Sequence, residues 1–272
     1  MIETLLYWML ATQFAHCLPL NPSPTEKAAF INLPVPVTFL EPTRTFHVKY
    51  RRRVKMPTIS EKDYALFNKQ LKNAFALYPV PLLKKHLKAI VPVHRFAFDD
   101  YSYGGSYSNS KCQSRQYVYL AVGAEDSTVQ GHDFSPEFIE EAFHHEFSSL
   151  LMHAYPFPEQ AWQSAAGVPF SYAFKEGGIE YLKKARKQEL SLYIPNEKKR
   201  YQLGILSDYG MSSLEEDFNV YSELLMTKPE HVKQLSQKYP AIARKVKLWH
   251  EFYRGIDPAF EHTRAFQIFL DP

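Results

Sequence analysis

The chain has 272 residues, of which 45% are hydrophobic and 22% are charged. This length allows one large domain or two small ones, and the hydrophobic content can form a packed core, which excludes a wholly disordered chain. The 32 basic and 29 acidic residues leave a net charge of +3, so no strong positive field indicates binding to nucleic acid. Two cysteines are too few for a disulfide framework or a cysteine-rich zinc cage.

Residues 1–20 contain an apolar segment that ends at Cys17. Its length of ~12 residues is too short for a helix across a bilayer of ~30 Å, but it suits the hydrophobic region of a signal peptide. That interpretation favours export or a place in the cell envelope, with the segment as a membrane anchor. The alternative is an amphipathic N-terminal segment or a wrongly chosen start, because no Lys or Arg precedes the apolar run. Residues 21–45 are rich in proline and predict an extended tether.

We expect one folded domain over residues 46–272, with strands up to about residue 130 and helices over 135–272. The alternating pattern FHVKYRRRV from Phe46 predicts a strand, and its basic run suits a solvated edge strand. A helix should follow, with Ser60 as its N-terminal cap. Four apolar residues recur on this helix at helical spacing: Tyr64, Phe67, Leu71 and Phe75.

Two further strands are predicted on either side of a glycine pair. The runs LKAIVPVHRFAF and RQYVYLAVG are rich in β-branched and aromatic residues, and a turn or loop that contains Gly104 and Gly105 joins them. One interpretation of the glycines is a turn with positive φ. The other is an edge strand beside a cleft, where glycine lets a peptide backbone approach closely.

A helix should begin at Ser135-Pro136-Glu137, which supply a cap, a first helical proline and an acidic first turn, and should run to about Ala154. Helical periodicity places Phe143, Phe147, Leu150, Leu151 and Ala154 on a buried stripe, and Glu141, His145, Ser149 and Met152 on a neighbouring face.

An aromatic-rich connection follows, in which we interpret Trp162 as a core residue, like Trp249 and Phe252 further along. Strands early and helices late indicate an α+β fold: a small, mostly antiparallel sheet followed by a helical C-terminal half. The helices of that half are predicted around 179–187, 214–226, 228–239 and 240–255.

Two stretches carry residues that suit metal chemistry. Histidines four apart on a helix can converge on zinc, and a glutamate next to the first can polarise metal-bound water. His145 and Glu146 supply two of these parts, but Ser149 occupies the position of the second histidine. Downstream, Tyr209 precedes Glu216 by seven residues at the start of a predicted helix.

In these stretches the chain resembles the gluzincin metallopeptidases of the anthrax lethal factor kind and, more closely, bacterial lipoproteins described as zinc-binding metallopeptidases. Those proteins have an H-H-E-F-x-H helix and a later Y-x-x-x-x-x-x-E-D-F-A-E segment, which is similar to Tyr209 to Glu223. The letters YGGSY, Tyr103 to Tyr107, are similar to the G-G-T-Y edge strand along the peptide groove of the Pro-Pro endopeptidases. The matching stretches span under half of the chain.

The resemblance implies a zincin-like active-site helix, zinc as the cofactor and an extended polypeptide as the substrate. It makes His145 the first zinc ligand, Glu216 the third ligand, Glu146 the general base and Tyr209 the hydrogen-bond donor to the oxyanion. The implied substrate groove consists of Gly104, Gly105, Ser106 and Tyr107.

Ser149 departs from this pattern, because a hydroxyl is a poor zinc ligand and is too short to replace an imidazole. His153 lies about 12 Å along the helix from His145, and His144 points about 100° away, where it suits the core or a hydrogen bond. The sequence therefore leaves three hypotheses: a metallopeptidase with an unorthodox or weakened zinc site, an inactive peptidase-derived module that binds peptide or envelope partners, and a structural protein of the cell surface. No pattern indicates an oligomeric state.

Overall fold

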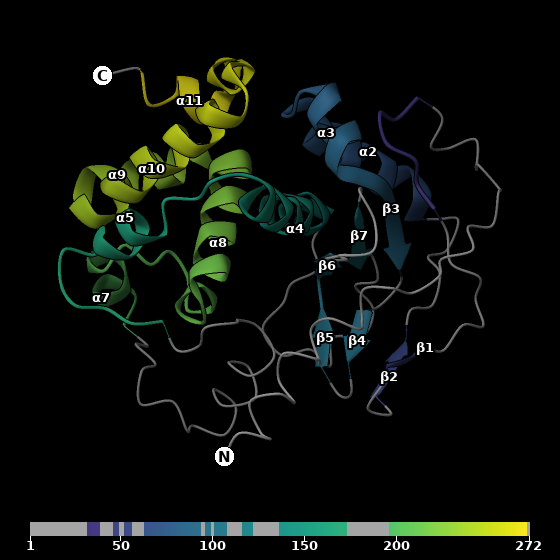
Figure 1. Cartoon of the computed structure of the whole chain (residues 1–272), viewed down its shortest axis with the longest axis horizontal. Coiled ribbons are helices and arrows are strands. Elements are labelled where there is room, and N and C mark those ends of the chain that lie inside the picture. Colours follow the sequence, from purple (N-terminus) through teal and green to yellow (C-terminus); the bar gives the residue numbers. More distant parts are fainter. Residues whose placement is uncertain are drawn as a thin grey trace. The chain divides into compact units, whose positions relative to one another are not determined.

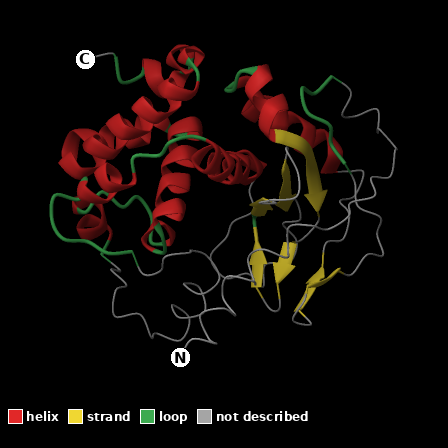
Figure 2. Ribbon diagram, in the orientation of Figure 1, coloured by secondary structure: helices red, strands yellow, loops and turns green. Residues whose placement is uncertain are grey.

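The computed structural model describes residues 32–38, 46–48, 52–55, 63–93, 96–98, 101–107, 116–121, 136–172 and 196–270. The chain divides into two compact units, Met1–Leu150 and Leu151–Pro272. Figure 2 shows the described strands in the first unit and helices in the second, which confirms the α+β fold with a helical C-terminal half. The predicted segment 1–20, the cap at Ser135 and the helix around 179–187 lie outside the described residues. Within those residues, no helix is both long enough and apolar enough to cross a membrane.

A four-stranded antiparallel sheet has the order β1-β2-β4-β5. The pattern FHVKYRRRV was expected to form one strand but forms two paired ones, and the basic β2 is an interior strand rather than an edge. Both arms of a hairpin alternate with period two, so the pattern does not reveal where the chain reverses. The strands are β1 (Phe46–Val48), β2 (Arg52–Lys55), β4 (Phe96–Phe98) and β5 (Tyr101–Tyr103).

A three-stranded sheet has the order β3-β7-β6, with β3 (Leu87–Val93), β7 (Gln116–Ala121) and β6 (Gly105–Tyr107). Strands β3 and β7 pair in parallel, whereas β6 pairs antiparallel with β7. The run LKAIVPVHRFAF was expected to form one strand that a glycine turn or loop joins to RQYVYLAVG, but it forms β3 and β4, and β5 and β6 lie between β4 and β7 in sequence. Both parallel strands are almost entirely buried, as is usual for parallel strands.

Residues 32–38 pair with the outer edge of β3. Val37 forms a parallel bridge with Ile90, Thr38 N donates to Ile90 O at 2.8 Å, and Ile90 N donates to Pro36 O at 2.9 Å. Val35 is fully buried. This part of the expected tether is therefore bound to the sheet, and β6 remains at the opposite end of the strand order.

Three helices accompany these strands: α2 (Tyr64–Ala76), α3 (Val80–His86) and α4 (Pro136–Ala154). Helix α2 buries its four predicted apolar residues and begins at Tyr64 after Asp63, and the expected cap at Ser60 lies outside the described residues. The bounds of α4 are confirmed, as is most of its buried stripe, but Ala154 is exposed. Phe143 anchors α4 through ring contacts with Phe75 and Tyr78, and it stacks on Phe147 of the same helix.

The second unit packs around α8 and α10, and Trp162, Trp249 and Phe252 are buried there as expected. Phe218 contacts the rings of Trp162 and Phe252, so α8, α10 and the segment before them share one core. Figure 1 labels the described α-helices of this unit, which are α5 (Glu159–Ser164), α7 (Glu197–Gln202), α8 (Leu214–Thr227), α9 (Pro229–Lys238), α10 (Pro240–Ile256) and α11 (Arg264–Gln267). Two 3-10 helices are η3 (Tyr209–Met211) and η4 (Pro258–His262).

Candidate functional site

The motif residues of α4 have different environments. His145 and Glu146 are half-buried, whereas Ser149 is fully buried. His144 is also fully buried, and its Nδ1 shares a 2.8 Å hydrogen bond with the hydroxyl of Tyr78. Burial lowers the pKa of His144, and the carboxylate of Glu140 opposes that shift from 3.8 Å, a distance too long for a hydrogen bond. His144 is therefore a core residue with a hydrogen bond, as its direction on the helix predicted.

The last turn of α4 carries His153, whose Nε2 lies 3.4 Å from Oε2 of Glu215 in the first turn of α8. The hydrogen bond and charge of Glu215 raise the pKa of His153, although partial burial acts in the opposite direction. His153 and Glu215 both belong to the second unit, and this histidine lies about 12 Å along α4 from His145.

Strand β6 packs directly against α4. A Cβ atom on Gly105 would lie 2.9 Å from Cγ of Glu146 and 3.0 Å from its Oε1, and a Cβ on Gly104 would lie 2.1 Å from the ring of Phe138. Atoms cannot approach so closely, so only glycine allows this contact between strand and helix. The structure thereby brings together two predicted features of the site, the glycine strand and Glu146.

Tyr209 and Glu216 lie on two adjoining elements of the second unit, η3 and the first turn of α8. Ser213 caps α8 by accepting a hydrogen bond from Glu216 N at 3.2 Å. Gly210 lets the two elements approach, since a Cβ there would lie 3.3 Å from Cα of Asp217. Tyr209 is half-buried and packs against the cluster formed by Ile205 and Met211. His145 and Glu146 belong to the first unit, and their convergence with Tyr209 and Glu216 stays a prediction.

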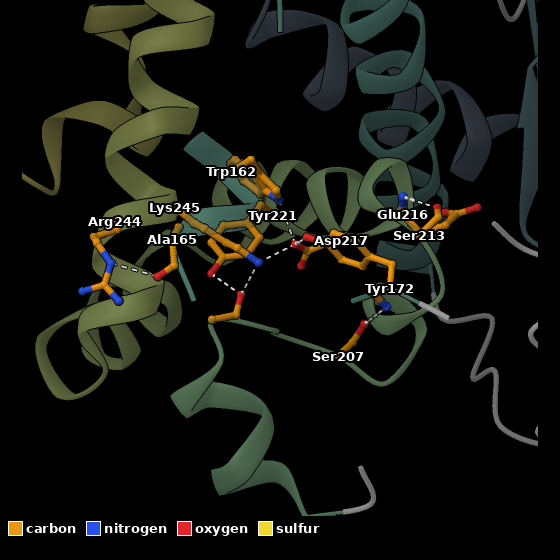
Figure 3. A network of polar contacts seen from close by, with 12 residues as sticks. Trp162, Ala165, Tyr172, Ser207, Ser213, Glu216, Asp217, Tyr221, Arg244 and Lys245 are labelled. Carbon is orange, nitrogen blue, oxygen red and sulfur yellow. Dashed lines mark hydrogen bonds and ion pairs between the residues drawn. The ribbon is translucent and has the colours of Figure 1, made fainter. Parts of the chain in front are cut away.

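Next to Glu216, the fully buried carboxylate of Asp217 collects three donors on Oδ2 (Figure 3). Trp162 Nε1 donates at 2.8 Å, the hydroxyl of Tyr172 at 2.6 Å and Lys245 Nζ at 2.5 Å. Burial raises the pKa of Asp217 and lowers that of Lys245, and the attraction within the pair opposes both shifts. The network fixes the first turn of α8, which carries Glu216.

Lys245 was not among the site residues predicted from sequence, although the apolar pattern around it indicates a buried lysine. It is only 1% exposed and lies on α10 between apolar residues at helical spacing. A lysine on the apolar stripe of an amphipathic helix indicates a buried cation that requires an acidic partner. The buried stripe consists of Ala241, Ile242, Lys245, Val246, Trp249, Phe252 and Tyr253.

The donor set of α4 does not suit a catalytic zinc ion. Such sites use three protein ligands, usually histidine or acidic side chains. Among the histidines of α4, His144 is buried against Tyr78 and His153 pairs with Glu215, while Ser149 offers only a buried hydroxyl. Across the described part of the chain, no group of three or more His, Cys, Asp or Glu residues is arranged to hold a metal ion.

Neither protein-family models nor curated proteins gave a match to the chain. A solved structure does match: the crystal structure of a "putative zinc-binding metallo-peptidase" from Bacteroides caccae, with a TM-score of 0.51. The chain has a metallopeptidase-like fold. The match covers 81% of this chain and 79% of the Bacteroides protein at 15% sequence identity. At this identity the likeness establishes the fold of the chain. The chemistry of the chain has to be inferred from the residues described above.

Proposed function

We propose that the protein is a peptide-binding module with a metallopeptidase-like fold, in which an extended polypeptide adds to β6 as a further strand. The observation that carries this proposal is the packing of Gly105 against Glu146 at one end of the β3-β7-β6 sheet. Backbone pairing at the end of a sheet provides affinity for extended chains, and the side chains beside it provide specificity.

The proposal treats His145 and Glu146 as polar groups that contact peptide, because α4 lacks the second zinc histidine. The serine in its place is fully buried, and the two other histidines of the helix have partners within the protein. The resemblance to lipoprotein metallopeptidases supports a partner in the cell envelope, and the export of this chain is part of the same proposal.

A second candidate is a zinc peptidase of gluzincin type with an unusual ligand set. The placement of Tyr209 and Glu216 on adjoining elements favours it, because the predicted oxyanion donor then lies on the element next to the one that carries the predicted zinc ligand.

Fluorescence anisotropy with labelled peptides of about nine residues, within the usual length of a strand, tests the first proposal. The replacement Gly105→Val should weaken binding at least about tenfold, because its Cβ would collide with Glu146. Circular dichroism should show an unchanged helix content, and Gly255→Ala on α10, with nothing within 4 Å of the added Cβ, is the matched control.

Zinc titration by calorimetry separates the two candidates. We expect weak zinc binding by the natural protein, since α4 supplies a single motif histidine. Binding tighter than micromolar that disappears in both His145→Ala and Glu216→Ala, together with cleavage of the peptides, would establish the second candidate instead.

A further inference from the structure

The stretch that forms α2, α3 and β3 carries charge of one sign only. From Tyr64 to Val93 the sequence contains five lysines and no arginine, aspartate or glutamate. The whole chain has a net charge of +3, so this stretch contributes +5 and the remaining residues sum to −2. Positive charge that is concentrated in one part of a nearly neutral chain indicates a surface for a negatively charged partner.

Three of these lysines define what we call the lysine face. Lys69 and Lys72 are exposed on α2, on the side opposite to the one on which Phe75 contacts α4. Lys84 is exposed on α3, one helical turn after Val80. Within the described residues, none of these three lysines takes part in an ion pair. Their positive charge is therefore available to a partner outside the chain.

An exposed apolar side chain lies next to the lysine face. Val80, the first residue of α3, is 46% exposed, and Pro81 after it is exposed as well. This combination suits a lipid surface, because an aliphatic side chain can enter the boundary of the acyl chains while lysine stems carry their ammonium groups to the head groups. A hydrophilic polyanion would leave Val80 in water.

We propose that the lysine face binds a membrane surface that contains anionic phospholipids, with Val80 inserted between the head groups. Each lysine close to such a surface strengthens binding about fivefold, and salt weakens the attraction. This inference goes beyond the proposed binding of peptide to β6, because β3 and β6 lie at opposite ends of the strand order. The two surfaces can therefore be occupied at the same time.

The position of residues 32–38 supports a membrane as the partner. Helix α3 leads directly into β3 (Figure 1), and Val37 pairs in parallel with Ile90 of that strand. Parallel pairing puts the N-terminal end of residues 32–38 beside the start of β3, which is also the end where α3 joins it. Residues 21–31 of the predicted tether reach at most about 40 Å when extended. A chain that is anchored through residues 1–20, as proposed, would thus hold α3 near the bilayer.

The test follows tryptophan fluorescence of the full chain carrying Val80→Trp, with the natural protein and its three tryptophans as the baseline. Vesicles of one part phosphatidylglycerol to about two parts phosphatidylcholine provide the anionic surface. They should shift the added emission to shorter wavelength, because residue 80 leaves water, whereas pure phosphatidylcholine vesicles should not. The shift reports contact at residue 80 even where another part of the chain binds the same vesicle.

The charges are tested by replacing Lys69, Lys72 and Lys84 together with glutamine in this variant. The lipid concentration at half of the shift should rise at least about tenfold, since three favourable charges are lost. A matched control removes the same net charge from other elements and should change that concentration by less than about twofold. It replaces with glutamine three exposed lysines of the second unit: Lys198, Lys238 and Lys247.

The remaining outcomes would overturn the proposal. Absence of a shift with the anionic vesicles would show that residue 80 does not contact lipid, and an equal loss in the two triple variants would show that the lysine face has no special part. A shift with polyglutamate but none with vesicles would assign the face to an acidic polypeptide instead of a membrane. Circular dichroism should show an unchanged helix content, because every replaced lysine is exposed.

Discussion

The carboxylate of Asp217 lies wholly inside the second unit, where an unpaired charge would cost several kcal/mol. Its Oδ2 is compensated by an ammonium, an indole and a phenol. Lys245 Nζ also donates to Gly204 O at 3.0 Å, and the hydroxyl of Tyr221 donates to the same oxygen at 2.9 Å. Side chains from α5, α8 and α10 thus meet around one oxygen atom, and each depends on the others for its hydrogen-bond partner.

Removal of the ammonium should therefore be costly. We expect Lys245→Met to lower the free energy of unfolding by about 3–5 kcal/mol, because Asp217 keeps its burial and loses its counter-ion. Urea denaturation measures this change. Lys247→Met on the same helix is the matched control, since Lys247 is 79% exposed and lies 3.9 Å from Glu251, and its effect should stay below about 1 kcal/mol. Equal stabilities of the two variants would contradict a structural role for the buried pair.

At the scale of an element, the end of α7 shows why one glycine is required. Ile205 N donates to Arg200 O and Gly204 N donates to Tyr201 O, the two hydrogen bonds of a Schellman motif. Gly204 has a φ of +74°, and a Cβ there would lie 3.1 Å from the backbone of Ala241. The turn also directs Gly204 O toward Lys245, so the helix end and the buried network depend on the same backbone position.

We expect Gly204→Ala to lower the free energy of unfolding by about 2–4 kcal/mol, through left-handed strain and overpacking against Ala241. Gly255→Ala, within α10 and with no atom near its added Cβ, should instead stabilise the protein by about 0.5–1 kcal/mol through the helix propensity of alanine. Thermal or urea unfolding of the two variants distinguishes them, and shifts in the same direction would refute this account of Gly204.

Which segments form helices or strands was largely predictable from the sequence, whereas the pairing of the strands was not. Apolar residues at spacings of three and four identify α2, α4, α8 and α10, because that period arises within a single helix. The parallel pairing of β3 with β7 and the binding of residues 32–38 to β3 join segments that are distant in sequence. Alternation predicts that a segment is a strand but does not specify its neighbour.

At the scale of the whole molecule, α4 runs through the boundary between the two units, which falls between Leu150 and Leu151. Phe143 belongs to the core of the first unit, while the buried Trp162 and Trp249 lie in the second. Since one continuous helix contributes to both units, we expect them to unfold together.

Phe143→Ala tests this cooperativity. The cavity should cost about 3–5 kcal/mol, and the unfolding midpoint detected by tryptophan fluorescence should fall to a lower urea concentration, although the described tryptophans are in the other unit. Glu137→Gln, at an exposed position of the same helix, should leave the midpoint unchanged. A fluorescence transition that stays in place in Phe143→Ala, while helical circular dichroism is lost earlier, would mean that the units unfold separately.

Sequence by itself determined the α+β order of elements, the bounds of α4 and the candidates His145, Glu146, Tyr209 and Glu216, because these follow from local periodicity and from motifs read along the chain. Tertiary structure alone decided which groups meet. It placed Gly105 on Glu146, enclosed His144 with Tyr78 and joined Asp217 to Lys245. Such contacts depend on how distant segments pack, and packing is selected by the burial of the whole core rather than by the preferences of any one segment.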